Sequence, residues 1–477
     1  MIVRRHRLAA VWARIGTRFL PFADSASPEI PLGQLLRLSL FQVSVGVALV
    51  LLNSTLNRVM IVEMHVAATL VAGMISLPIL VAPLRLILGH RSDFHRSYLG
   101  WRRVPYIWMG TMLQFGGLAI MPFALIVLSG DAEAPAIVGY AAAALAFLLV
   151  GAGLHTTQTA GLALANDLAP SDRRHRVVAL LYVMLLAGMF TAAIAFSFLL
   201  ANFSQIRLIQ VIQGAAALTM VLNIIALWKQ EPRRPALMLA DVAPPPFLET
   251  WRALWADRRC RRLLLAVGLG TAGFSMQDIL LEPYGGEVLR LSVSATTFLT
   301  AISASGMLIG FALSARALDG GRDTHMLAAS GLLIGIPAFC AVVFSAPLQS
   351  PLVFQIGAFL IGLGGGLFSV GTLTAAMHSV SDGASGRMLG AWGTAQAVAA
   401  GTAMALSGPI RDGVGFLAEA GLLGAPMQGP ASGYMVVYHI EIALMFLGLA
   451  AIGPLVRYRR PSSRSPQASF GLAEHPG

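Results

Sequence analysis

The sequence predicts an all-α integral membrane protein with twelve transmembrane helices. Three observations support this prediction. The mean hydropathy is +0.74, and only 12% of the 477 residues are charged, whereas soluble domains carry about 25% charged residues. The apolar residues also fall into runs of about 20 or more, the length that crosses a bilayer as a helix. A soluble enzyme of ordinary type is therefore excluded.

The apolar runs divide into six before and six after a polar stretch. The first six occupy residues 38–59, 66–88, 104–128, 136–163, 177–201 and 206–228. The last six occupy residues 263–282, 294–315, 325–346, 351–378, 388–410 and 434–456. The expected organisation is a basic segment 1–37, a six-helix half 38–228, a linker 229–262, a second half 263–456 and a tail 457–477.

The orientation follows from the basic residues. All 33 lysines and arginines fall on one side of the predicted spans except Arg58, Arg207, Arg290 and Arg411. Because cytoplasmic loops are enriched in basic residues, both termini and the linker are expected in the cytoplasm. This topology also accounts for the net charge of +11. Nucleic acid is not an expected partner, because the basic residues are spread over separate loops.

The basic N-terminal segment has two interpretations. Four arginines from Arg4 to Arg18 would share one face of a helix, and apolar side chains from Leu8 to Phe19 would share the adjacent face. Such an amphipathic helix would lie on anionic membrane lipid. The alternative is a solvated basic tail that only sets the orientation.

The two halves contain similar segments. The glycine-rich run that starts at Gly151 is echoed by the run that starts at Gly364, and the loop of Asp93 is echoed by the loop of Asp319. A parallel repeat with a cytoplasmic Gly/Asp/Arg loop after its second helix resembles the major facilitator superfamily. The resemblance implies that Asp93 pairs with Arg102 and Arg103 as a cytoplasmic gate, with Asp319 as the counterpart. The alternative is that these charges only set the topology.

Three longer strings resemble one branch of that superfamily. They run from Asn57 to Glu63, from Gly100 to Trp108 and from Met276 to Leu289. They look like signature stretches of the PucC/LhaA family of phototrophic bacteria. The resemblance implies a factor, closer to the core-antenna (LH1) branch, that assembles light-harvesting antennae and binds or delivers bacteriochlorophyll. The implied partners are antenna polypeptides, the pigment synthesis and insertion machinery, and membrane lipid. The implied location is the inner, intracytoplasmic photosynthetic membrane.

Charged residues within the first and seventh spans suggest a second gate. A charge at membrane depth is costly unless it is paired, so Arg58 is expected to pair with Asp278 and to close the outer end. The alternative is that both side chains are solvated at the periplasmic interface. Glu63 and Glu282 share this ambiguity.

His155 is the candidate pigment ligand. Its imidazole, within the fourth span, is suited to bind the magnesium of bacteriochlorophyll, and Gly151 and Gly153 would let a flat macrocycle approach the backbone. The alternative is a histidine hydrogen-bonded to a neighbouring helix.

Motifs for catalysis or nucleotide binding are lacking. The run from Gly362 to Gly366 does not have the strand-turn-helix context of a nucleotide site and is expected to serve close helix packing. No catalytic activity and no nucleotide cofactor are therefore expected. Two other functions stay open: a proton-coupled secondary transporter of an amphipathic solute, and a scaffold without pigment.

Overall fold

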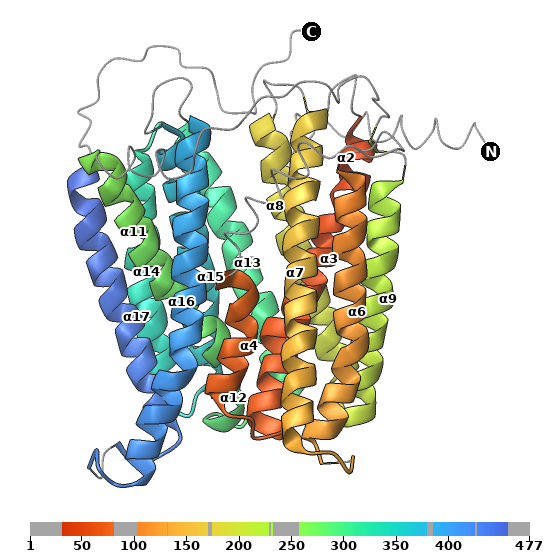
Figure 1. The fold of residues 1–477 in the computed structure, drawn as a ribbon. Helices are drawn as coiled ribbons and strands as arrows, with labels where there is room; N and C mark the ends of the chain where they lie inside the picture. The colour runs from red at the N-terminus through yellow and green to blue at the C-terminus, as the bar shows by residue number, and fades with distance from the viewer. Residues whose placement is uncertain are drawn as a thin grey trace.

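The computed structural model describes residues 31–80, 103–130, 132–169, 174–228, 230–231, 257–378, 385–424 and 427–456. Within these residues the chain is helical and has no strand (Figure 1). Ten helical segments of this part are long and apolar enough to cross a membrane. The protein is therefore a multi-pass helical membrane protein, as the composition predicts.

The helices form two groups in chain order. The N-terminal group contains α2 (Leu32–Leu38), α3 (Leu40–Leu49), the π-helical segments η2 (Val50–Leu56) and η3 (Val59–Glu63), α4 (Ala68–Leu80), α6 (Val104–Leu128), α7 (Ala136–Leu168), α8 (Arg174–Leu199) and α9 (Gln205–Leu227). The C-terminal group contains α11 (Arg258–Ser275), α12 (Gln277–Glu287), α13 (Val293–Asp319), α14 (Thr324–Ser345), α15 (Pro351–His378), α16 (Ser385–Glu419), α17 (Ala431–Ile452) and the 3₁₀ turn η6 (Gly453–Leu455).

The first span is longer than expected. It runs from Leu32 to Glu63 instead of from residue 38 to 59, and its second part is π-helical. Hydropathy does not reveal a π-helix, because the wider turn keeps the same apolar residues. Such segments are rare and are often found at functional sites. The amphipathic helix expected between Arg4 and Arg18 lies outside the described residues.

The seventh helix starts inside the predicted linker. The Asp257 carboxylate accepts a hydrogen bond from the Arg259 backbone N–H at 2.7 Å and caps α11. This bond holds the pKa of the Asp257 carboxyl below its usual value. The cap satisfies one of the free N–H groups of the first turn. The arginines from Arg258 to Arg262 therefore belong to a helix and not to the linker.

Glycines bring neighbouring helices into close contact. A Cβ at Gly362 or Gly366 of α15 would collide with the backbone of α13, and a Cβ at Gly364 would collide with the backbone of α14. Small residues are the usual means of close packing between membrane helices. The prediction that the run from Gly362 to Gly366 serves packing is confirmed.

The two groups meet at the end of the bundle opposite α2, where α4 and α12 lie (Figure 1). Hydrogen bonds between the groups, within the described ranges, join Thr55 to Thr297, Asn57 to Ile279, Arg58 to Leu291, Thr69 to Asp412 and Ser197 to Ser294. We call this region the closed end.

Candidate functional site

The short helix α12 is the centre of the closed end. It is separated from α11 by a break at Met276, which leaves the Gln277 backbone N–H without an acceptor in its own helix. That N–H donates to Glu441 Oε1 on α17 at 2.6 Å. The Gln277 side chain donates to the Phe274 carbonyl at 3.2 Å and to the Asp278 carboxylate. The backbone N–H at the break is thus satisfied by a side chain of α17 instead of by a carbonyl of the preceding helix.

A proline inside α12 frees a second backbone group. Pro283 has no N–H, so the carbonyl of Ile279, four residues earlier, has no donor in the helix. Asn57 of the N-terminal group donates its Nδ2 to this carbonyl at 2.7 Å. Asn57 is fully buried. The proline and the asparagine are therefore complementary, and together they tie the two groups at membrane depth.

Arg58, the residue after Asn57, makes a different contact from the one predicted. It forms an ion pair with Glu63 on its own helix and donates Nη2 to the Leu291 carbonyl at 3.0 Å. The predicted pair with Asp278 is wrong. Arg58 packs against Gly286, which lies about 12 Å along the α12 axis from Asp278. The alternative of solvation also fails for Arg58, which is only 4% exposed.

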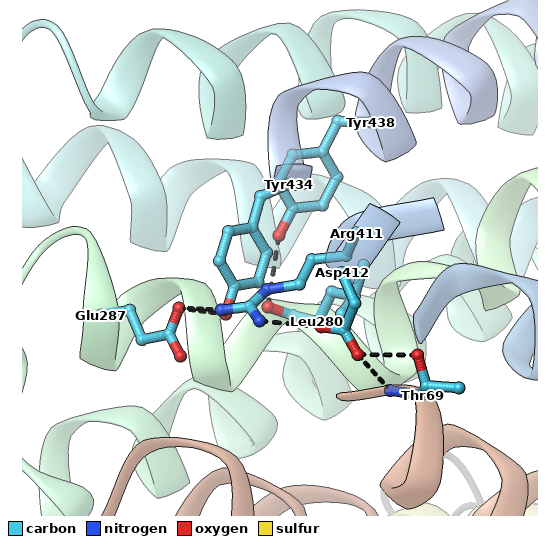
Figure 2. Close-up of polar contacts among 7 residues, drawn as sticks. All are labelled: Thr69, Leu280, Glu287, Arg411, Asp412, Tyr434 and Tyr438. Carbon is cyan, nitrogen blue, oxygen red and sulfur yellow. Dashed lines mark hydrogen bonds and ion pairs between the residues drawn. The ribbon is translucent and has the colours of Figure 1, made fainter. Parts of the chain in front are cut away.

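A second arginine contacts the last residue of α12 (Figure 2). Arg411 of α16 forms ion pairs with Glu287 and Asp412, the latter at 2.9 Å. Its guanidinium lies 4.8 Å from the ring centroid of Tyr434, a distance typical of a cation–π contact. The Tyr434 hydroxyl donates to Glu287 at 2.8 Å. The charge of the half-buried Arg411 is thus balanced by two carboxylates and by the face of one aromatic ring.

Asp412 extends this network to the N-terminal group. Its Oδ2 accepts hydrogen bonds from both the backbone N–H and the hydroxyl of Thr69, each at 2.7 Å (Figure 2). Thr69 lies in the first turn of α4, where free N–H groups and the helix dipole favour an anion. A carboxylate of one group therefore caps a helix of the other. We call Thr69, Glu287, Arg411, Asp412 and Tyr434 the latch.

Aromatic rings pack α12 onto its own group. The Tyr284 ring lies 5.5 Å from the rings of Phe354 and Tyr434 and 5.4 Å from that of Tyr438, measured between centroids. Its hydroxyl donates to the Val342 carbonyl at 3.1 Å. Buried tyrosines of this kind combine apolar packing with a satisfied polar end. They hold α12 rigidly where it meets the N-terminal group.

Two further predicted gate residues pair elsewhere or not at all. Glu282 is buried and accepts a hydrogen bond from Thr300 at 2.9 Å, which belongs to its own group. Asp319 is exposed at the end of α13 and forms no ion pair within the described residues. Thr300 is therefore one partner of Glu282, and it lies in the same group. The inter-half roles predicted for Glu282 and Asp319 stay predictions.

The predicted cytoplasmic gate is described only in part, because Asp93 and Arg102 lie outside the described residues. Arg103 Nε donates to Asp167 at 3.0 Å. Glu231 accepts the backbone N–H groups of Arg103 and Val104 at the start of α6. An anion is favoured at this helix N-terminus. Asp167 belongs to the N-terminal group and Glu231 follows α9, so these contacts fix the start of α6. The gate role predicted for Arg103 stays a prediction.

The candidate pigment site is only partly present. The His155 ring is half-buried and has no hydrogen-bond partner within the described chain, so the expected bond to a neighbouring helix is not seen. A Cβ at Gly151 would collide with Pro78 of α4, and one at Gly153 would collide with the backbone of α6. Both glycines therefore serve helix packing, and the prediction that they open the backbone to a macrocycle is wrong. Among the described residues, this site therefore has one imidazole, and its two glycines offer no open backbone surface for a macrocycle.

The latch was missed at the level of sequence, although signals for it existed. Arg411 is one of four basic residues on the predicted outer side, and Glu287 belongs to the string from Met276 to Leu289. A single basic residue there predicts a carboxylate partner, but the hydropathy pattern does not identify that partner. The arrangement as a whole can hold the two groups together and release them when its ion pairs separate.

Known proteins are similar to this chain in sequence and in fold. The family described as "PUCC protein" matches residues 55–460. An uncharacterized protein in the puhA-bchM intergenic region of Rhodobacter capsulatus is 55% identical over the full length of both chains. Protein PucC of Rhodovulum sulfidophilum is 56% identical over 84% of this chain and 90% of its own. Among solved structures, the nucleoside transporter NupG superposes with a TM-score of 0.68 at 13% identity, over 89% of this chain and all of NupG.

Proposed function

The chain belongs to the PUCC protein family, and from this membership we propose that it assembles light-harvesting antennae, the core antenna above all, in the photosynthetic membrane. The observation that supports the proposal is the family match, which spans residues 55–460 and so almost all of both helical groups. Two strings that resemble the family's signatures, from Asn57 to Glu63 and from Met276 to Leu289, lie at the closed end. The similarity therefore includes the candidate functional site itself.

We propose a topology of twelve spans in two six-helix repeats, with both termini in the cytoplasm. The helices α4 and α16 would complete the ten apolar spans of the described part. The orientation is supported by Arg58 and Arg411, two of the four basic residues on the predicted outer side. Both contact residues at the closed end, which lies opposite α2 (Figure 1). The membrane would be the inner, intracytoplasmic photosynthetic membrane of a bacterium.

Bacteriochlorophyll is the proposed cargo, and antenna polypeptides and the pigment synthesis and insertion machinery are the proposed partners. Membrane lipid would surround the apolar helix faces. The free imidazole of His155 is the one described feature that favours pigment, because the nearby glycines are covered. We therefore derive no step through the pigment. We propose no catalytic role for any described residue.

The test is a deletion of the gene in a phototrophic bacterium. Membranes of the deletion strain should lose near-infrared absorbance of the core antenna, and a plasmid copy should restore it. Purified protein from the complemented strain should carry near-infrared absorbance if pigment is bound. A normal antenna in the deletion strain would overturn the assembly role.

The second candidate is a proton-coupled transporter of an amphipathic solute. Two observations favour it: the fold is shared with transporters such as NupG, and Glu282 and Glu441 are buried carboxyls at membrane depth, where ionisable residues mark proton pathways. A deletion strain with an intact antenna, together with solute-dependent proton uptake by reconstituted protein, would favour this function.

A further inference from the structure

Three carboxyl groups near the start of α12 have no cationic partner among the described residues. Asp278 and Glu282 lie on α12, and Glu441 lies on α17. Every ion pair recorded at the closed end uses other carboxylates, because Arg58 pairs with Glu63 and Arg411 pairs with Glu287 and Asp412. The three carboxyl groups thus form an acidic cluster without a cationic side chain to balance it.

Glu441 is the most isolated of the three. Its side chain is fully buried in the middle of α17. Oε1 accepts one hydrogen bond, from the neutral backbone N–H of Gln277 at 2.6 Å. Oε2 is buried and has no partner. Glu282, in contrast, accepts a hydroxyl hydrogen bond from Thr300, and Asp278 accepts one from the Gln277 amide and is half-buried.

The helices packed against α17 supply no positive charge to Glu441. From α12, the nearest acidic group is Asp278, and a negative charge on it would repel one on Glu441. From its own helix, Tyr438 is the nearest titratable group, and its hydroxyl is turned toward the Leu280 carbonyl. The arginines of α11 and His325 of α14 lie at the far ends of those helices. On α16, Arg411 is held by Glu287 and Tyr434.

An ionised carboxylate in this position would be very unfavourable. Moving an unpaired charge into an apolar interior costs far more than moving a neutral polar group, and one neutral N–H does not compensate. A proton on Oε2 removes the charge, requires no cavity, and leaves the bond from Gln277 to Oε1 in place.

We propose that Glu441 is a proton-binding site whose carboxyl is neutral in this closed conformation. The proton comes from water, forms the O–H bond on Oε2, and returns to water when it is released. Release would place a negative charge close to the Asp278 carboxyl in the first turn of α12. The proton on Glu441 therefore stabilises the packing of α12 on α17. This inference goes beyond the assembly role and holds whether or not the chain carries pigment.

Infrared spectroscopy of the purified full-length protein tests the proposal. Protein labelled with ¹³C at the glutamate carboxyls should show, at neutral pH, the carbonyl stretch of a protonated carboxyl, shifted by the label. The label excludes Asp278 as the source. The band should disappear reversibly at high pH. Its absence at neutral pH in the wild-type protein would overturn the proposal without any variant.

Two matched variants assign the band. Glu441→Gln keeps an acceptor for the Gln277 N–H and should lose the band, whereas Glu282→Gln should keep it. Loss of the band in Glu282→Gln alone would overturn the assignment. If Glu441→Gln does not fold, a band retained in Glu282→Gln still supports Glu441, the other buried glutamate among the described residues. A band that vanishes when sodium is added at constant pH would show that sodium, not a proton, is the occupant, and would also overturn the proposal.

Discussion

The Asn57 side chain donates to the Ile279 carbonyl at 2.7 Å, and that carbonyl is available because Pro283 has no N–H to offer it. The Ile279 carbonyl of α12 therefore depends on the other group for its hydrogen-bond donor. The contact differs from an ordinary surface contact because both partners are buried. Its loss leaves a polar group unsatisfied in an apolar environment.

The first prediction is that Asn57→Ala destabilises the protein by about 1–3 kcal/mol, the usual cost of an unpaired buried acceptor. Pro283→Ala restores an N–H that can bond the Ile279 carbonyl within α12. Asn57→Ala should therefore cost less in the Pro283→Ala background than in the wild type. Thermal unfolding in detergent of the two single variants and the double variant measures this coupling. Purely additive effects would contradict the complementarity of the two residues.

The second prediction concerns the latch. Asp412→Ala removes the carboxylate that caps α4 and pairs with Arg411, and it should destabilise the protein by about 0.5–2 kcal/mol, the range for losing a helix cap. Thermal unfolding in detergent measures this loss. Glu419→Ala is the control, because Glu419 is an exposed carboxylate at the end of the same helix. Equal stability of the two variants would show that Asp412 does not hold the closed end.

The third prediction separates the two possible partners of Arg58. Because Arg58 pairs with Glu63 and lies about 12 Å along the axis from the level of Asp278, Arg58→Ala and Glu63→Gln should be non-additive. Arg58→Ala and Asp278→Asn should add to within about 0.5 kcal/mol, as distant sites do. Double-mutant cycles on thermal unfolding supply both numbers. A large coupling to Asp278 would mean that the pair predicted from the sequence forms after all.

The sequence predicts the helices better than it predicts their contacts. The span predicted at residues 104–128 is α6, Val104–Leu128, because Arg103 and Pro105 mark its start and the apolar run its length. The break at Met276 was not predicted, because the apolar run continues across it. The ion-pair partner predicted for Arg58 is also wrong. Hydropathy shows that a charge lies within a span, but it does not show which residues of another helix lie at the same depth. The latch depends on Thr69, Glu287 and Asp412, whose proximity arises only from the packing of α4, α12 and α16.

The last prediction concerns the glycines once expected to admit a macrocycle. A Cβ at Gly153 would collide with the Gly110 carbonyl and the Gln114 backbone nitrogen of α6, and backbone atoms cannot move aside cheaply. Gly153→Ala should therefore destabilise the protein by about 1–3 kcal/mol, as overpacking does. Gly116→Ala on the facing helix is the matched control, because a Cβ there meets open space and alanine favours a helix by about 1 kcal/mol over glycine. Thermal unfolding of both variants in detergent should give opposite signs. If Gly153→Ala were as stable as Gly116→Ala, the close contact of α6 with α7 would be wrong, and the space beside His155 would again be open to a pigment.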